Sequence, residues 1–302
     1  MSNHTKALFA IILTTILWSV VGPFMKIIYK SIDPYPLAFI RFLIAFLFIL
    51  PIFLKTKAHF KISKLLIFAV LVSIGNIFFF YLGILTTTAI MSTMIYAAVP
   101  LIVLVLANLF IKETITQIKL FGFLIGFIGI IFIVLLPVLE KGNIIIGDLR
   151  GNLLVFAATV CWSFYTIASR YLITSKNYSP VTLSTATFAG CAIFFGILTF
   201  IFPHRSILKA IQQPLNLGLI LYISTVATVF TFLLYQWAIK YSSAGTASLG
   251  NYLQPVFTIF FSMILIGESM TLSFVFGALL VFLGLILVSS KKAVLVFNRL
   301  NK

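Results

Sequence analysis

The stretch Thr88-Ala89-Ile90-Met91-Ser92-Thr93-Met94-Ile95-Tyr96-Ala97-Ala98-Val99-Pro100 begins an apolar segment of membrane-spanning length with a proline near its middle. The segment occurs twice, because an offset of 155 residues takes Ala89 to Ala244 and Pro100 to Pro255. The same offset relates further identical pairs: Glu113 and Glu268, Thr116 and Thr271, Gly122 and Gly277, and Gly129 and Gly284. The sequence therefore predicts two homologous halves.

The paired prolines point to irregular backbone inside the membrane. A proline within a helix has no N–H for the carbonyl four residues earlier, so Pro100 and Pro255 would free the carbonyls of Tyr96 and Asn251. Lipid cannot satisfy such carbonyls, which are therefore expected to face protein or a wet cavity. Matched, proline-interrupted spans are typical of a transporter's substrate site. A packed proline kink is the structural alternative.

The composition excludes an ordinary soluble domain. Hydrophobic residues make up 62% of the 302 residues and charged residues only 9%. Apolar runs of about 20 residues predict an all-α integral membrane protein with ten transmembrane helices. The predicted spans begin near Ala7, Tyr35, Leu65, Thr88, Lys119, Gly151, Pro180, Leu215, Ala244 and Leu272.

The charge pattern predicts topology rather than a nucleic-acid partner. The formal charge is +16, but the basic residues lie between the spans instead of on one face. If the N-terminus is cytoplasmic, most of the 21 Lys and Arg residues fall on the inner side, so both termini are predicted to be cytoplasmic. Cys161 and Cys191 fall within spans, and their spacing indicates neither a disulfide nor a metal site. No cofactor is predicted.

A second offset, of 144 residues, relates the starts of the two halves. It takes Trp18 to Trp162 and Lys26 to Arg170. Each repeat has five predicted spans, an odd number, so the second repeat should be inverted in the membrane relative to the first. The predicted units are a first repeat over 7–138, a linker over 139–150, a second repeat over 151–290 and a basic cytoplasmic tail over 291–302.

Three basic residues are candidates for the substrate pathway. Lys26 and Arg170 lie near opposite ends of their spans, where each is either a snorkelling anchor or a cation at one mouth of the pathway. Arg41 lies deeper in its span and has no counterpart in the second repeat. With no carboxylate predicted inside the bilayer, its partners should be carbonyls, hydroxyls, phosphate or substrate.

Polar side chains within the spans are the next candidates. Asn76 and Tyr81 lie in the third span, and Gln236 lies in the eighth at the position related to Tyr81. Asn251 and Gln254 are three residues apart and share a helix face beside Pro255. Such amides either hydrogen-bond between helices or bind a polar substrate.

The paired glutamates Glu113 and Glu268 allow two interpretations. A carboxylate near Thr116 or Thr271 suits a helix N-terminus, where it stabilises unpaired N–H groups. The alternative is proton coupling, but no carboxylate or histidine is predicted in the membrane interior. Transport is therefore expected to be driven by a substrate gradient or by exchange, or to be coupled through a group that the sequence does not identify. The glycines that follow are expected to allow close helix approach.

The order of these residues resembles a known family. Trp18-Ser19, Lys26, Asp33-Pro34 and Arg41 resemble the first half of an EamA-type repeat. Ile111-Lys112-Glu113-x-x-Thr116 and Ile266-Gly267-Glu268-x-x-Thr271, each followed by spaced glycines, resemble its second half. The resemblance, which covers nearly the whole chain, is to the drug/metabolite transporter superfamily.

That resemblance implies ten helices in the plasma membrane, the inner membrane of a bacterium, with both termini inside. It also implies a central cavity lined by helices one, three, four, six, eight and nine. The substrate-pathway candidates are Trp18, Lys26, Arg41, Asn76, Tyr81, Tyr96, Pro100, Trp162, Arg170, Gln236, Asn251, Gln254 and Pro255.

The expected function is secondary transport of a small metabolite, such as an amino acid, nucleoside or drug, by alternating access. The alternatives are a scaffold, a channel or a membrane enzyme. An enzyme is disfavoured because acid–base or metal chemistry needs His, Asp or Glu at a site. The three histidines and both aspartates lie in the tail or loops.

Overall fold

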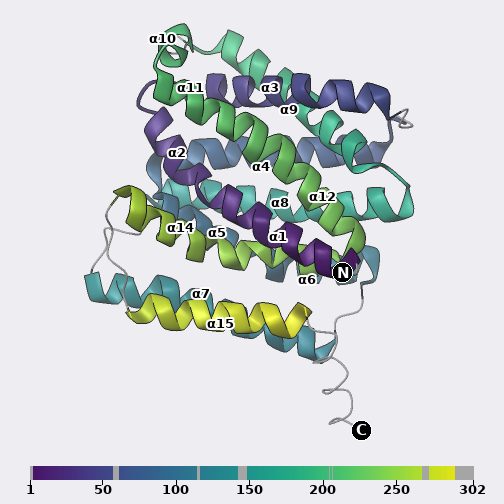
Figure 1. The fold of residues 1–302 in the computed structure, drawn as a ribbon, viewed down its shortest axis with the longest axis vertical. Helices are drawn as coiled ribbons and strands as arrows, with labels where there is room; N and C mark the ends of the chain where they lie inside the picture. The colour runs from purple at the N-terminus through teal and green to yellow at the C-terminus, as the bar shows by residue number, and fades with distance from the viewer. Residues whose placement is uncertain are drawn as a thin grey trace.

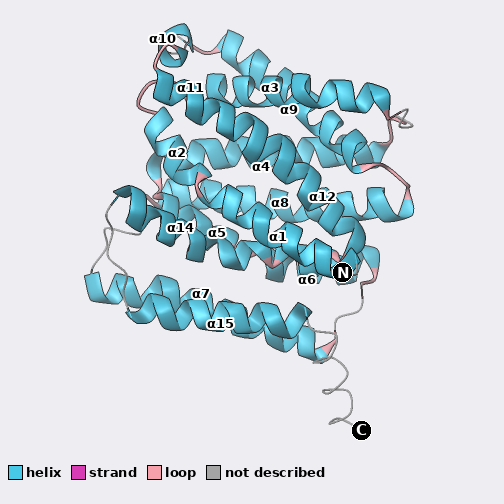
Figure 2. Cartoon of the chain, viewed as in Figure 1, coloured by secondary structure: helices cyan, strands magenta, loops and turns pink. Residues whose placement is uncertain are grey.

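The computed structural model describes residues 3–56, 61–113, 116–141, 148–203, 205, 207–266 and 272–289. In these parts of the chain the regular structure is helical throughout (Figure 2). The helices are α1 (Asn3–Ser19), α2 (Val21–Ile28), α3 (Pro34–Lys55), α4 (Lys64–Thr86), α5 (Ala89–Tyr96), α6 (Val99–Ile111), α7 (Gln117–Lys141), α8 (Leu149–Ser175), α9 (Pro180–Ile201), α10 (Ile207–Ile211), α11 (Pro214–Leu221), the π-helix η2 (Tyr222–Phe230), α12 (Thr231–Tyr241), α13 (Ala244–Ser248), α14 (Gly250–Ile266) and α15 (Leu272–Ser289).

Seven helical stretches of the described chain are long and apolar enough to cross a membrane. They are Thr5–Ile28, Pro34–Lys55, Lys64–Thr86, Ala89–Ile111, Leu149–Ser175, Pro180–Ile201 and Pro214–Tyr241. Shorter apolar stretches, Gln117–Gly129 and Leu279–Val288, lie within α7 and α15. The structure is therefore that of a multi-pass membrane protein, and the count of ten spans stays a prediction. The predicted linker boundaries, at 139 and 150, lie inside α7, which runs to Lys141, and α8, which begins at Leu149. The predicted tail over 291–302 lies outside the described residues.

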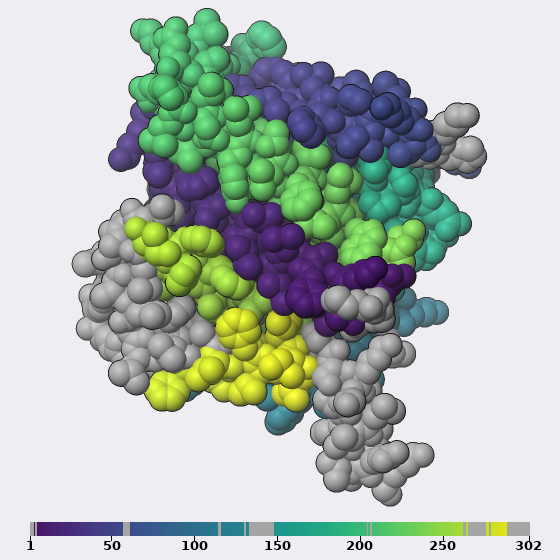
Figure 3. Space-filling view, viewed as in Figure 1, coloured from purple at the N-terminus to yellow at the C-terminus, as the bar shows by residue number. Residues whose placement is uncertain are grey.

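Helices of the two halves pack against one another rather than forming separate bundles. Helices α7 and α15 run side by side at one edge of the molecule, and α3 and α9 lie together at the other (Figure 1). Between them, α4 packs along α8 and α1 packs along α12. These two pairs correspond to each other when the halves are exchanged, because each joins the first long helix of one half to the third of the other. The space-filling view shows α1 lying between α12 and α14 (Figure 3).

Glycines allow α7 and α15 to approach at backbone distance, as the sequence predicted. A Cβ added at Gly129 would lie 2.7 Å from the carbonyl oxygen of Gly277, and one at Gly122 would lie 2.9 Å from that of Gly284. Neither position accommodates a larger residue unless the two helices move apart.

The two matched prolines lie in different local structures. The fourth span breaks after Tyr96, so Pro100 occupies the first turn of α6, where a missing N–H costs no hydrogen bond. Pro255 lies inside the continuous helix α14, and the break in that span comes earlier, between Ser248 and Gly250. The expectation of a mid-helix proline is therefore wrong for Pro100, because the preceding helix has already ended.

A proline in the first span does release a carbonyl that another helix uses. Pro23 has no N–H for the carbonyl of Ser19, where α1 ends. That carbonyl accepts a hydrogen bond from the hydroxyl of Thr258 in α14, at 3.1 Å. The break between α1 and α2 is therefore hydrogen-bonded to α14, a helix of the second half.

Candidate functional site

A cavity of about 660 Å³, counted with the space at its mouth, lies where helices of both halves converge. Its lining consists of Trp18, Val21, Gly22, Arg41, Asn76, Ile77, Phe80, Ser92, Thr93, Tyr96, Trp162, Phe232, Asn251 and Gln254. Lys26, Tyr81, Pro100, Arg170, Gln236 and Pro255 do not belong to this lining. The structure thus brings together about half of the candidates that the sequence suggested.

Arg41 supplies the only charge in the described lining of this cavity. Its side chain comes from α3 and is only 5% exposed. The guanidinium donates from Nε to the hydroxyl of Thr228 at 2.6 Å, and from one terminal nitrogen to the hydroxyl of Tyr81 at 3.0 Å. The other terminal nitrogen lies 3.4 Å from the carbonyl oxygen of Ala227. Hydroxyls and a carbonyl are the partners expected for a membrane arginine without a carboxylate.

The backbone that receives Arg41 is a π-helix, η2. The hydroxyl of Thr228 donates to the carbonyl of Ile223, five residues earlier, at 2.7 Å. The carbonyl of Ala227 also accepts the indole N–H of Trp18 at 3.0 Å. One backbone carbonyl of η2 therefore joins α1 and α3 beside the cavity. A π-helical turn is rare and occurs frequently at functional sites.

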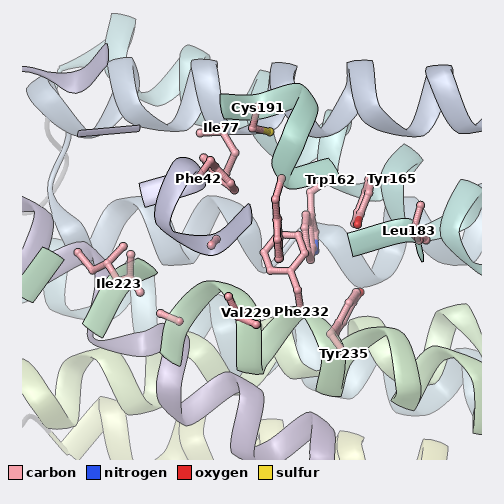
Figure 4. Packing of buried hydrophobic residues seen from close by; sticks show 14 of the residues in the cluster. Phe42, Ile77, Trp162, Tyr165, Leu183, Cys191, Ile223, Val229, Phe232 and Tyr235 are labelled. Carbon is pink, nitrogen blue, oxygen red and sulfur yellow. The ribbon is translucent and has the colours of Figure 1, made fainter. Parts of the chain in front are cut away.

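Aromatic rings form most of the apolar wall. Trp162 from α8 and Phe232 from α12 point toward one another, with ring centroids 5.8 Å apart (Figure 4). Trp18 meets Trp162 edge-on at 5.4 Å, and Phe80 meets Tyr96 edge-on at 5.5 Å. Edge-to-face contacts are a favourable geometry for aromatic pairs, so the wall is held in shape by its own packing.

The amides of the lining differ in how far the protein already uses them. Asn76 donates to the hydroxyl of Tyr96 and to the carbonyl oxygen of Ala158 at 2.9 Å, so it joins three helices. Asn251 donates to the carbonyl of Ser248 at 2.9 Å and satisfies the end of α13. The side-chain amide of Gln254 makes no hydrogen bond to other described residues, and it lies on the cavity wall.

The two basic residues at the span ends lie against neighbouring helix ends. Arg170 forms an ion pair with Glu113 at 3.1 Å and donates to the carbonyl of Lys240 at 3.2 Å. Lys26 lies 3.5 Å from the carbonyl oxygen of Leu85. Leu85 and Lys240 are related by the 155-residue offset. Lys26 and Arg170 therefore make the same contact in the two halves.

The remaining polar candidates act behind the lining. Tyr81 holds Arg41, and Gln236 donates to the hydroxyl of Tyr165 at 2.8 Å, which links α12 to α8. Thr228, which accepts from Arg41, is among the residues that the sequence did not single out, as are the lining residues Thr93 and Phe232. A threonine in an apolar span is common, and no sequence pattern marked the π-helix that turns this hydroxyl toward Arg41.

The fold and the cavity define a multi-pass helical membrane protein built from two related halves. Residues 5–135 and 149–290 each match the EamA-like transporter family, and the chain belongs to that family. In the described part of the chain, no three His, Cys, Asp or Glu side chains gather to form a metal site.

Relatives and a solved structure extend this finding. An uncharacterized transporter of Archaeoglobus fulgidus is 28% identical over 286 residues, covering 93% of this chain and 97% of the relative. The uncharacterized transporter YoaV of Bacillus subtilis is 24% identical over 291 residues, covering 93% and 95%. A crystal structure of a protein at 15% identity covers 99% of both chains with a TM-score of 0.77, which shows a shared fold. The relatives are named transporters rather than enzymes.

Proposed function

We propose that the protein is a secondary transporter that moves small metabolites, such as amino acids, nucleosides or drugs, across the plasma membrane by alternating access. The observation that carries the proposal is the cavity between the two halves. Trp18, Asn76 and Tyr96 reach it from the first half, and Trp162 and Asn251 reach it from the second. A site at the junction of two repeats changes its accessible side when one repeat rocks against the other.

The helix packing supports an arrangement of ten spans in two inverted five-helix repeats, with both termini in the cytoplasm. The α4–α8 pair and the α1–α12 pair correspond under exchange of the halves. Such correspondence is what a pseudo-two-fold axis between inverted repeats requires. The orientation follows from the distribution of basic residues between the spans.

We further propose that transport is driven by the substrate gradient or by exchange. The described cavity lining has no Asp, Glu or His side chain that would bind a proton. The carboxylate of Glu113, which follows α6, is paired with Arg170. A proton-coupled carrier usually keeps a titratable group in the membrane interior.

The test is counterflow in proteoliposomes. Vesicles containing the purified protein are loaded with mixed amino acids, nucleosides and organic anions, and exchange of labelled compounds is followed by mass spectrometry, with protein-free vesicles as the control. We expect saturable exchange of one chemical class, unchanged when a pH gradient is imposed. Uphill accumulation driven by the pH gradient would contradict the proposed energetics. Flux without saturation would indicate a channel, and no flux from folded protein would favour a scaffold.

A further inference from the structure

Arg41 places a buried positive charge beside the cavity without a carboxylate to neutralise it. The ion pairs of the described chain are Arg170 with Glu113 and Arg205 with Asp33, both near helix ends. Arg41 is more deeply buried than either, yet its hydrogen-bond acceptors are two hydroxyls and one carbonyl. A desolvated charge that has only neutral partners attracts an anion strongly, because little water remains to screen it.

The guanidinium has donors left for such an anion. It carries five N–H groups, and the protein contacts use one on each nitrogen. One N–H on each terminal nitrogen remains. Two N–H groups are what a carboxylate accepts when it pairs with arginine through both of its oxygens.

The surroundings hold Arg41 in place before any ligand arrives. Thr228 donates its own proton to Ile223, so its oxygen is left to accept from the Nε of Arg41. The rings of Phe42 and Tyr81 lie 5.1 Å and 5.9 Å from the guanidinium carbon. A guanidinium that is already ordered loses little further freedom when it binds a ligand.

The rest of the cavity suits an apolar body. The apolar part of the wall consists mainly of the rings of Trp18, Phe80, Trp162 and Phe232. Ser92 and Thr93 also line the cavity, but their hydroxyls donate to carbonyls of their own helix. The amide of Gln254 adds one polar group whose hydrogen bonds the described protein does not use. A compound with one anionic end and a flat or branched apolar body would pair its charge with Arg41 and pack its body against the aromatic rings. A cationic compound would be repelled by the buried positive charge of Arg41.

We propose that the cavity binds organic carboxylates, as simple anions or as zwitterions, with the carboxylate paired to Arg41 and the apolar body against Trp18, Trp162 and Phe232. This narrows the proposed transport function to one substrate class and excludes nucleosides and purely cationic drugs. The claim about binding is separable from transport, because it is tested on purified protein in detergent.

The experiment compares ligands of one shape and different charge by calorimetric titration. The probes are 3-phenylpropanoate, its neutral amide, the zwitterion phenylalanine and the cation 2-phenylethylammonium. Hexanoate and hexanamide repeat the comparison without a ring. We expect each carboxylate to bind about tenfold or more tightly than its amide, as loss of a charged hydrogen-bonded pair implies. The relative affinities of phenylalanine and 3-phenylpropanoate separate zwitterions from simple anions.

Arg41→Gln should abolish the preference for carboxylates, whereas Arg205→Gln, which removes an arginine that pairs with Asp33 and does not line the cavity, should retain it. Equal affinity for carboxylate and amide in the unaltered protein would overturn the proposal, and this result needs no variant to fold. Retained preference in folded Arg41→Gln, or no binding by any probe at millimolar concentration, would overturn it as well. Carboxylate binding without counterflow would instead contradict the transport function while leaving the anion site intact.

Discussion

Glu113 and Arg170 connect the two halves of the protein at one end of the bundle. The carboxylate accepts from the Nε of Arg170 at 3.1 Å and from the backbone N–H of Ala244 at 3.2 Å. One side chain at the end of α6 therefore holds the end of α8 and the start of α13. The sequence suggested that Glu113 and Thr116 cap the next helix, α7, but the hydroxyl of Thr116 has no hydrogen-bond partner among the described residues. Glu113 instead accepts from the first N–H of α13 in the other half.

This connection predicts an energetic coupling between Glu113 and Arg170. Both side chains are about one-fifth exposed, which lies between a surface pair and a fully buried one. We expect a double-mutant cycle of Glu113→Gln and Arg170→Gln to give a coupling free energy of about 1 kcal/mol. Thermal unfolding in detergent measures it, and additive losses would show that the ion pair contributes nothing.

The ion pair also changes how a loss of transport in Glu113→Gln is interpreted. Such a loss has a structural explanation, because the variant weakens the contact between the halves. The response of exchange to an imposed pH gradient is therefore the measurement that identifies proton coupling.

Asn251 and Asn216 form a matched pair for separating substrate binding from stability. Both are nearly fully buried, and each amide donates to a group three residues earlier, the carbonyl of Ser248 and the side chain of Gln213. Only Asn251 lines the cavity. We expect Asn251→Ala and Asn216→Ala each to lower the free energy of unfolding by about 1 kcal/mol, and therefore to lower the thermal unfolding temperature by similar amounts. Counterflow should fall severalfold in Asn251→Ala alone, and equal exchange in both variants would make Asn251 a structural residue.

Thr228 should contribute more to stability than another threonine of the same π-helix. Thr228→Val leaves the Nε–H of Arg41, whose side chain is only 5% exposed, without its acceptor at 2.6 Å. We expect a loss of about 1–3 kcal/mol. Thr225→Val is the control, because its hydroxyl donates only to the carbonyl of Leu221 near the surface, and a change within about 0.5 kcal/mol is expected. Unfolding curves that coincide for the two variants would show that the hydrogen bond from Arg41 to Thr228 does not contribute to the stability of the protein.

Gly129 should not tolerate even a methyl group. A Cβ there would lie 2.7 Å from the Gly277 carbonyl oxygen and 2.8 Å from the Val281 nitrogen, both backbone atoms. Gly129→Ala is expected to cost about 1–3 kcal/mol through separation of α7 and α15. Gly218→Ala is the matched control, since a Cβ at Gly218 has nothing within 4 Å and improves helix propensity. A stable Gly129→Ala would show that the two helices separate easily.

Several features could be predicted because they depend on local or repeated sequence. Apolar runs predicted the seven described stretches that are long and apolar enough to cross a membrane, and constant offsets predicted the two halves. The same offsets placed Trp18 and Trp162 at related positions, and both line the cavity. The glycines of the fifth and tenth predicted spans indicated close packing, which Gly122 and Gly129 show.

The sequence alone determined the membrane class, the duplication and the family resemblance, because hydropathy and repeated identities need no knowledge of which helices touch. Tertiary structure decided which polar residues face the cavity. The rotation of each helix about its axis, and the breaks within spans, place Arg41 and Gln254 on the cavity wall. Arg170 instead pairs with Glu113, and Gln236 donates to Tyr165. These outcomes depend on contacts between residues far apart in the chain, which no local pattern specifies.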